Sequence, residues 1–345
     1  MLYRLARAAL FQLDAEHAHA LTLHTLAKAP GFSGAVLGVP RVADPTPLMG
    51  LRFPNRVGLA AGLDKNGECL AAWEHFGFGF VEVGTVTPRP QAGNPKPRMF
   101  RLPAHAAIIN RLGFNNLGMQ ALSERLRATR HRFTGVLGIN IGKNADTPIE
   151  RAADDYVACL RHLHSQADYI TVNISSPNTR NLRDLQSDAA LDALLASIAA
   201  ARATLAQAEG RKAPVLVKIA PDLPDEALPG IVAMARQHGM DGLIATNTTL
   251  SRTAVQGHVY AQEAGGLSGA PVRDRAQAVI ARLRTVAGAG FPLIGVGGIG
   301  SAADGVARVE AGADLVQVYT GFIYQGPALI ESLASALVQC NRKLT

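Results

Sequence analysis

Short, almost wholly apolar runs recur along the chain from residue 56 to residue 321. Most are rich in β-forming residues and apolar at successive positions, as strands of a parallel sheet are when both faces are buried. The pattern predicts eight strands, at 56–63, 78–86, 135–142, 169–175, 214–220, 242–248, 292–299 and 315–321.

The segments between these strands show the 3.6-residue period of amphipathic helices. They lie at 69–76, 121–130, 153–166, 188–209, 226–239, 273–288 and 301–312. Repeated β-then-α units predict an α/β protein, a (β/α)8 TIM barrel. An open doubly wound sheet is the alternative, but eight strands without a break in composition after residue 50 favour the barrel.

The first 40 residues lie outside this repeat, so we expect an N-terminal helical extension (1–40) and a barrel (41–345). Two helices are predicted in the extension, separated near Asp14, with the second ending near Pro30. The apolar face of the first carries Leu2, Leu5, Ala9, Leu10 and Leu13, with Arg4 and Arg7 off it, and the second carries Ala18, Leu21, Leu23, Leu26 and Ala27. Periodicity alone favours amphipathic helices that simply pack on the barrel.

Composition places the chain among globular proteins, since 48% of its residues are hydrophobic and 18% are charged. It contains no run of 18 apolar residues, so we expect no helix that spans a membrane. The cysteines are scattered, at Cys69, Cys159 and Cys340, and predict neither a disulfide framework nor a metal or cluster site.

The net charge of +7 is concentrated in one segment. Between Val86 and Arg132 there are nine Lys or Arg residues and one acid, Glu124. Such a field suits an anionic substrate, a phosphate, an anionic membrane or a nucleic acid. From charge alone, a solvated basic face is the simpler interpretation.

The carboxyl ends of the predicted strands are unusually rich in polar residues and glycine. These residues are Asp64-Lys65-Asn66, Thr85, Asn140, Asn173 with Ser175-Ser176, Lys218, Thr246-Asn247-Thr248, Gly297-Gly298 and Tyr319-Thr320. A single polar strand end is an ordinary turn. Because the carboxyl ends of all the strands meet at one face of a barrel, the set predicts an active site there.

The types of these residues indicate an anionic ligand. Lys65 and Lys218 follow buried runs, and an inward lysine is costly without an anionic partner. Gly298, Tyr319 and Thr320 lie after the seventh and eighth strands, where barrels commonly bind phosphate. A second glycine turn at 265–271 could add backbone N–H groups, although tight turns alone would also explain these glycines.

Several long motifs resemble one family and occur in its order. They are "NRVGLAAGLDKNGE", "GFVEVGTVTPRPQAGNPKPRMFRL", "INRLGFNN", "GINIGKN", "NISSPNT", "LVKIAPD", "NTT", "GGLSGAP" and "GVGGI". The chain is similar to dihydroorotate dehydrogenases from about residue 10 to 330. Serine in "NISSPNT" and the N-terminal extension resemble the class 2, quinone-linked branch. The resemblance implies an FMN barrel that oxidises dihydroorotate to orotate in pyrimidine biosynthesis.

The resemblance also implies roles for individual residues. The cofactor contacts would be Ala61, Gly62, Leu63, Asp64, Lys65, Thr85, Asn140, Asn173, Lys218, Thr246, Gly269, Gly298, Tyr319 and Thr320. The substrate contacts would be Lys65, Asn110, Arg111, Leu112, Gly113, Phe114, Asn173, Asn178, Asn247 and Thr248. Adjacent Ser175 and Ser176 point to opposite sides of an extended chain, and the resemblance selects Ser176 as the base.

In the class 2 family the extension lies on the membrane and forms the quinone entrance, with Arg101 and Tyr319 matching positions at its inner end. The resemblance therefore implies a peripheral enzyme on the cytoplasmic face of the cell membrane, bound to an anionic surface through its N-terminal helices. No nucleic acid, protein partner or metal is expected, and a monomer is favoured.

Two other functions fit parts of the sequence. A flavin barrel that reduces uridine in tRNA would explain the basic charge, but no cysteine stands at a suitable strand end to act as its acid. A non-catalytic barrel could bind RNA or a membrane through the basic segment, but it would not need polar strand ends. Purified protein that is yellow from bound flavin would favour a flavin enzyme over the non-catalytic binding protein.

Overall fold

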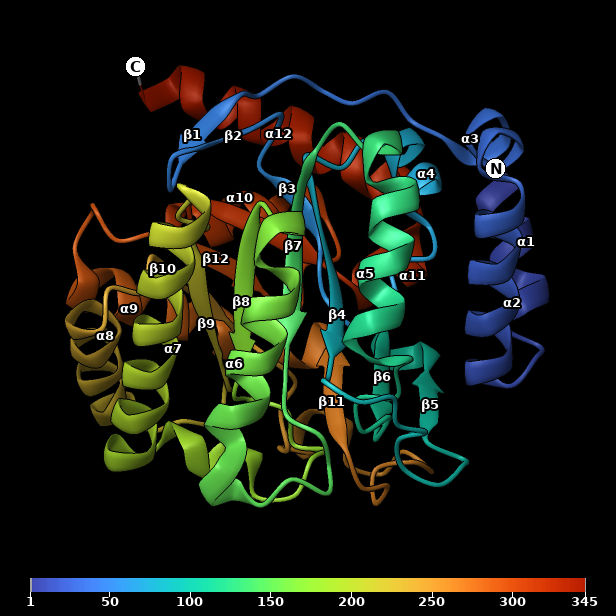
Figure 1. Ribbon diagram of the computed structural model, residues 1–345. Coiled ribbons are helices and arrows are strands. Elements are labelled where there is room, and N and C mark those ends of the chain that lie inside the picture. Colours follow the sequence, from blue (N-terminus) through green and yellow to red (C-terminus); the bar gives the residue numbers. More distant parts are fainter. Residues whose placement is uncertain (1, 345) are drawn as a thin grey trace.

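The computed structural model describes residues 2–344, in which eight parallel strands close into a barrel (Figure 1). Each predicted strand is present, which confirms the TIM-barrel prediction. Around the barrel the order is β3-β4-β7-β8-β9-β10-β12-β13. The strands are β3 (Val57–Leu59), β4 (Phe80–Val86), β7 (Val136–Ile141), β8 (Tyr169–Asn173), β9 (Val215–Ile219), β10 (Gly242–Ala245), β12 (Leu293–Val296) and β13 (Leu315–Val318).

Helices follow the strands and cover the barrel from outside (Figure 1). They are α4 (Leu70–Trp73), α5 (Gly118–Thr129), α6 (Ala152–Leu163), α7 (Asp188–Glu209), α8 (Leu228–Gln237), α9 (Arg273–Ala287), α10 (Ala302–Glu310), α11 (Thr320–Gln325) and α12 (Ala328–Leu344). The seven predicted helical segments are confirmed, while α11 and α12 were not predicted. By length and composition α7 could cross a membrane, but it packs between α6 and α8 in the barrel wall.

A hairpin closes the amino-terminal end of the barrel, at the top of Figure 1. It consists of β1 (Thr46–Leu48) and β2 (Leu51–Phe53). The ring of Phe53 packs edge-on against that of Phe80, with 5.3 Å between ring centroids. Phe53 belongs to a cluster of buried apolar residues from most of the barrel strands, so this end is filled with side chains.

Arginine–aspartate pairs tie the barrel together at the same end. In each, an aspartate just before or at the start of one strand accepts a backbone N–H from the start of its neighbour, and an arginine from the helical layer binds that aspartate. The pairs are Arg130–Asp168, Arg202–Asp241 and Arg284–Asp314. Each arginine also binds backbone carbonyls, so the clamps join helix, loop and sheet.

A small antiparallel sheet stands over the opposite end of the barrel, at the bottom of Figure 1. Its order is β11-β6-β5, with β5 (Met99–Leu102), β6 (Ala107–Asn110) and β11 (Gly266–Gly269). The sequence predicted a glycine turn at 265–271, but residues 266–269 form a strand. This glycine-rich segment has little intrinsic strand preference, so its pairing with β6 determines its conformation.

Three helices near the N-terminus pack against one side of the barrel (Figure 1, right). They are α1 (Leu2–Leu10), α2 (Ala15–Lys28) and α3 (Pro30–Leu37). Pro30 begins α3 where the sequence predicted only an end, because proline suits the first turn of a helix. Glu16 joins α2 to the segment just before β5 through Arg98, with N–O distances of 2.7 and 3.0 Å.

The predicted apolar face of α1 is divided between two environments. Leu2 and Leu5 are 59% and 64% exposed. By contrast, Tyr3 donates to the carbonyl of Ile323 in α11 at 2.6 Å, and Arg7 donates to that of Tyr324. The side of α1 that faces the protein is therefore partly polar, and leucines of the other side remain uncovered.

One carboxylate lies inside the barrel, where solvent does not reach. Glu82 of β4 is fully buried. Asn140 Nδ2 donates to it at 2.8 Å and Gln317 Nε2 at 2.9 Å, while the hydroxyls of Tyr169 and Thr171 donate at 3.0 and 3.1 Å. Two of these donors are amide N–H groups that can only donate, so the network needs an acceptor at its centre, which the two oxygens of Glu82 provide.

We predict that Glu82→Ala lowers the free energy of unfolding by about 3 kcal/mol, because it leaves several buried donors without an acceptor. The measurement is urea unfolding of the full-length protein, followed by circular dichroism.

Glu310→Ala is the matched control, since Glu310 is an exposed carboxylate on α10. Its effect should stay within about 0.5 kcal/mol. Equal unfolding midpoints for the two variants would show that the Glu82 network does not stabilise the barrel.

Candidate active site

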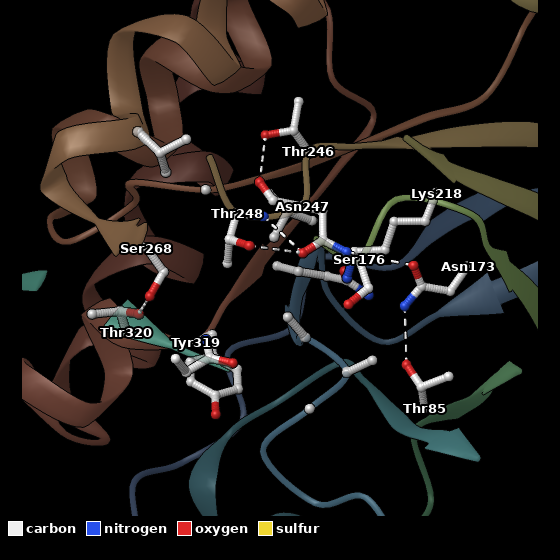
Figure 2. Close-up of a pocket in the computed structure, with 18 of the residues that line it drawn as sticks. Thr85, Asn173, Ser176, Lys218, Thr246, Asn247, Thr248, Ser268, Tyr319 and Thr320 are labelled. Atoms are coloured by element: carbon white, nitrogen blue, oxygen red, sulfur yellow. Dashed lines mark hydrogen bonds between the residues drawn. The ribbon is translucent and has the colours of Figure 1, made fainter. Parts of the chain in front are cut away.

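A cavity of about 990 Å³, including its open mouth, lies at the carboxyl ends of the barrel strands (Figure 2). Nearly all of the predicted cofactor and substrate residues line it, although they come from segments far apart in the chain. They are Ala61, Gly62, Lys65, Thr85, Asn110, Leu112, Gly113, Phe114, Asn173, Ser176, Asn178, Lys218, Thr246, Asn247, Thr248, Gly269, Gly298, Tyr319 and Thr320.

Four predicted residues do not line this cavity. Asp64 turns away, and its carboxylate accepts the backbone N–H groups of Glu68 and Cys69 at 2.7 and 2.9 Å. The Trp73 indole N–H also donates to it at 2.9 Å. This carboxylate therefore caps the segment leading into α4, a role that its position beside Lys65 did not reveal.

The other three are displaced for different reasons. Arg111 pairs with Glu263 at 2.6 Å and stacks on Phe100, so its side chain lies outside the cavity. Leu63 lines a second, apolar cavity. Asn140 lies one layer behind the wall, where it binds Glu82 and accepts from Thr85 at 2.5 Å.

Sequence reasoning did not assign several other lining residues. They are Ala60, Ser268, Val272, Val296, Ile299, Gln317, Val318 and Gly321. A signal existed for Gln317 and for Glu82 beneath it, because each is a polar residue in the middle of a buried apolar strand. Buried polar groups of this kind need partners, and here each is a partner of the other.

Two buried lysines give the cavity its positive charge. Neither the Lys65 nor the Lys218 ammonium group makes a hydrogen bond to another described residue, and the two residues are only 8% and 5% exposed. Burial lowers the pKa of Lys65 to about 8, against the opposing effect of Glu16. Burial also lowers the pKa of Lys218, whereas the charge of Glu82 raises it. Both ammonium groups would be stabilised by an anionic ligand.

The adjacent serines diverge, as the extended chain predicts. Ser175 Oγ donates to Asn173 Oδ1 at 3.1 Å and accepts from Asn247 Nδ2 at 3.0 Å, so it is held behind the wall. Ser176 lines the cavity and is 5% exposed. Its Oγ accepts the backbone N–H of Asn178 at 3.2 Å. Of these two serines, Ser176 is therefore the one that can present its hydroxyl to a ligand in this cavity.

Amide side chains provide the rest of the polar wall. Asn173 Nδ2 donates to Thr85 Oγ1 at 3.0 Å (Figure 2) and to Asn140 Oδ1 at 3.1 Å. The buried oxygens Oδ1 of Asn178 and Oε1 of Gln317 have no hydrogen-bond partner among the described residues. These acceptors could receive N–H groups of a flat, amide-like ligand.

Glycines form the opposite end of the cavity. A side chain at Gly298 would place its Cβ 2.3 Å from Arg273 Cα, and one at Gly269 would lie 2.2 Å from the carbonyl oxygen of Ala106. Both residues also have positive φ angles. Beside them, Thr320 Oγ1 donates to Ser268 Oγ at 2.8 Å (Figure 2). Backbone N–H and hydroxyl groups can therefore approach a phosphate closely here.

A second cavity of about 890 Å³ lies between the N-terminal helices and the barrel. Its lining is mainly apolar, with Leu10, Phe11, Leu26 and Met99 among its residues. Tyr319 is the residue that lines both cavities within the described chain. Gly62 permits this arrangement, because a Cβ there would lie 3.3 Å from the Tyr319 ring.

Three basic residues, Arg7, Arg101 and His19, line this apolar cavity. Arg101 was predicted there, and it binds the carbonyl of Leu10 at 3.1 Å and stacks on Phe11. His19 was not predicted. Burial, aided by the charge of Lys65, lowers the pKa of His19 to about 3, so its ring is neutral at physiological pH. The only feature of the sequence that could have predicted this position is that His19 stands among apolar residues of α2.

The basic segment seen in the sequence is largely compensated in space. Its arginines pair with acids from other segments, as Arg89–Asp146, Arg98–Glu16, Arg111–Glu263 and Arg130–Asp168. Local charge counting could not detect this, because the partners are distant in the sequence. Much of the local basic excess is therefore neutralised by ion pairs.

Comparisons with known proteins agree with this geometry. Residues 45–340 match the family model described as dihydroorotate dehydrogenase. The chain is 56% identical to the dihydroorotate dehydrogenase (quinone) of Delftia acidovorans, covering 98% of both chains. It is 58% identical to the protein of that name from Acidovorax ebreus, covering 97% of both.

Solved structures show the same fold. The crystal structure of DHODH from Eimeria tenella in complex with ferulenol has a TM-score of 0.89 and 37% identity, covering 96% of this chain and 92% of that one. The ligand-free form gives a TM-score of 0.87 and 37% identity, covering 96% of both. The chain belongs to the dihydroorotate dehydrogenase family, in its quinone-linked branch, and is an oxidoreductase.

Proposed function

We propose that this enzyme oxidises (S)-dihydroorotate to orotate through bound FMN and passes the electrons to a membrane quinone. The observation that carries the proposal is a pair of cavities, one polar with buried lysines and one apolar, which meet at Tyr319. A polar anionic substrate and an apolar acceptor need such different surroundings. Family membership supports the same reaction, a step in pyrimidine biosynthesis.

The residues of the polar cavity fit FMN. The glycine end with Gly269, Gly298 and Thr320 suits the phosphate, because it offers backbone N–H groups and a hydroxyl without obstructing side chains. Lys218 and the amide wall suit the polar edge of the ring system. When bound, FMN would supply the hydride acceptor of this oxidation and the electron source for the quinone.

The remaining space beside Ser176 suits dihydroorotate. Lys65 can pair with the substrate carboxylate, and Asn110, Asn178 and Asn247 offer donors and acceptors to its ring amides. The loop at 110–114 borders the same space. Holding the ring at several points orients its two reacting carbons, which is a large part of catalysis.

Ser176 is the proposed catalytic base. Its Oγ would take a proton from one ring carbon as hydride leaves the neighbouring carbon. Serine is a weak base, so it needs a desolvated site, and its 5% exposure supports this assignment.

The apolar cavity is the proposed quinone site, with Arg101 and Tyr319 at its inner end. Neutral His19 could donate its one N–H to a quinone oxygen there. In this proposal residues 1–40 form the quinone entrance and residues 41–345 the catalytic barrel, although Met1 and Thr345 lie outside the described chain.

The exposed apolar side chains of the N-terminal helices support membrane contact. Leu2, Leu5, Leu21, Phe32 and Val36 are between 40% and 71% exposed. Such a face suits peripheral binding at the cytoplasmic surface of the cell membrane, with anionic lipids. We propose no requirement for a protein partner or nucleic acid, and a monomeric enzyme.

The direct test of the reaction is anaerobic oxidation of dihydroorotate with quinone, fumarate and NAD offered separately. We expect turnover with quinone. Yellow protein that turns over with fumarate or NAD but not with quinone would contradict the proposed acceptor.

We predict that Ser176→Ala retains bound flavin and orotate affinity but reduces the rate of flavin bleaching by dihydroorotate about 10²–10⁴-fold. The loss arises because no other group takes the proton at that carbon. Anaerobic rapid mixing measures the rate.

Ser175→Ala is the matched control, because the Ser175 hydroxyl binds only the polar wall. Its rate of flavin reduction by dihydroorotate should fall much less than that of Ser176→Ala. The assignment is wrong if Ser176→Ala reacts at the wild-type rate and Ser175→Ala does not.

We predict that orotate binding to the holoenzyme weakens as the pH rises above about 8, the pKa of Lys65. The carboxylate pairs with the protonated amine, so affinity approaches a tenfold loss per pH unit above that value and stays level below it. Orotate titration of the flavin absorbance at a series of pH values measures this.

Lys65→Arg keeps its charge over the same range, so its orotate affinity should not show the fall. An unchanged pH dependence in this variant would place the titrating group elsewhere.

We predict that the combined variant Leu2→Gln, Leu5→Gln, Phe32→Gln binds anionic vesicles about tenfold more weakly and turns over a long-tailed quinone more slowly. These side chains are 59%, 64% and 71% exposed, so the variant should fold and keep its rate with a short-tailed quinone. Vesicle sedimentation and quinone-linked turnover are the measurements.

Leu250→Gln with Val259→Gln is the control, because these residues are also exposed but lie outside the N-terminal helices. If both variants bind vesicles equally, the N-terminal face is not the membrane contact.

A further inference from the structure

Arg308 of α10 is the largest charged side chain that is fully buried in the described structure. Its Nη1 donates to the carbonyl oxygen of Val296 at 3.0 Å. Its Nη2 donates to the carbonyls of Gly297 at 2.9 Å and Arg273 at 3.1 Å. The guanidinium therefore lies directly behind the glycine end of the polar cavity.

Among the described residues, no acid forms an ion pair with this guanidinium. Among the described residues, every hydrogen bond of Arg308 goes to a backbone carbonyl, and its buried Nε has no partner. The arginines of the three arginine–aspartate pairs at the other end of the barrel differ, because each has an aspartate partner. In one of them, Arg284 and Asp314 are 2.8 Å apart. A buried charge without a counterion costs several kcal/mol.

Asp304 and Asp274 act on Arg308 through their charge but form their hydrogen bonds and ion pairs with other residues. Asp304 accepts from the backbone N–H of Gly300 at 3.0 Å and from the Ser301 hydroxyl at 2.8 Å. Asp274 pairs with the partly exposed Arg273 at 3.0 Å. Burial lowers the pKa of Arg308 to about 10, against the opposing charges of Asp304 and Asp274, and leaves it protonated at neutral pH.

The backbone connects this charge to the cavity. Arg308 holds the carbonyl of Gly297, and in a trans peptide the N–H of the next residue, Gly298, points the opposite way. That N–H makes no hydrogen bond to another described residue. Gly295 makes room for the arrangement, because a Cβ there would lie 2.5 Å from Arg308 Cγ.

The glycine end also lacks a cation of its own. Its lining consists of Ser268, Gly269, Val272, Gly297, Gly298, Ile299, Thr320 and Gly321. None of these can neutralise a phosphate dianion. Only one peptide unit would separate an anion bound there from the Arg308 guanidinium. The region is poorly solvated, so the attraction between the two charges would be strong.

We propose that Arg308 is the positioning residue for the FMN phosphate: it orients the peptide at Gly297-Gly298 toward the cavity and neutralises the phosphate without touching it. This inference rests on the proposed use of FMN. It predicts that the contribution of Arg308 is specific to the phosphate group, whereas a purely structural role would affect the whole cofactor site.

The test uses the ³¹P resonance of FMN in the full-length holoenzyme. A phosphate monoester has a second pKa of about 6 in water. In the wild type the bound phosphate should remain dianionic, with no shift of its resonance from about pH 5.5 to 8. In Arg308→Met the resonance should titrate within that range. Arg308→Lys keeps the charge and should resemble the wild type.

Flavin affinity supplies the second readout. Full-length protein freed of flavin is titrated with FMN and with riboflavin, which lacks the phosphate, by flavin fluorescence. Arg308→Met should bind FMN about 30-fold more weakly and riboflavin within about twofold of the wild type. Arg284→Met, which loses carbonyl contacts at the other end of the barrel, should preserve the preference for FMN.

The outcomes separate the two proposals. A wild-type protein that binds neither flavin overturns the proposed function and this inference with it. A wild-type phosphate that titrates like free FMN overturns the inference alone. Equal losses of FMN and riboflavin affinity in Arg308→Met would also overturn the inference alone. If that variant does not fold, the phosphate titrations of the wild type and of Arg308→Lys still test the inference.

Discussion

The structure depends on a carboxylate that must be satisfied inside the barrel. Glu82 cannot be buried without donors, and it obtains them from β7, β8 and β13. Because Asn140 gives its N–H₂ to Glu82, its oxygen faces Thr85 and Asn173. One requirement of the core thus fixes the orientation of the polar wall on which the candidate site is built.

The carboxyl end of the barrel, where this polar wall lies, separates two chemical environments. On one side lie amides, hydroxyls and buried lysines, and on the other the apolar space beneath α1 and α2. Tyr319 stands between them, and Gly62 leaves room for its ring. An enzyme that takes electrons from a polar anion and gives them to an apolar acceptor needs this separation together with a short path across it.

The sequence predicted what local patterns determine. Buried parallel strands are apolar on both faces, so all eight were visible, and their polar ends identified most of the cavity lining. Distant partners were not visible. The residues next to Asp64 in the sequence do not predict its hydrogen bond to Trp73. Those next to Arg111 do not predict its ion pair with Glu263. For the same reason the basic segment was read as a charged face, although its partners lie elsewhere in the chain.

The central claim is that substrate and quinone occupy separate cavities that meet at Tyr319. It is tested most directly by the dissociation constant of orotate from the holoenzyme, measured with and without a saturating, non-reducible quinone analogue. The account predicts that the two ligands bind together, with orotate affinity changed by less than about threefold. Competition, with orotate affinity falling in proportion to the analogue concentration, would contradict it.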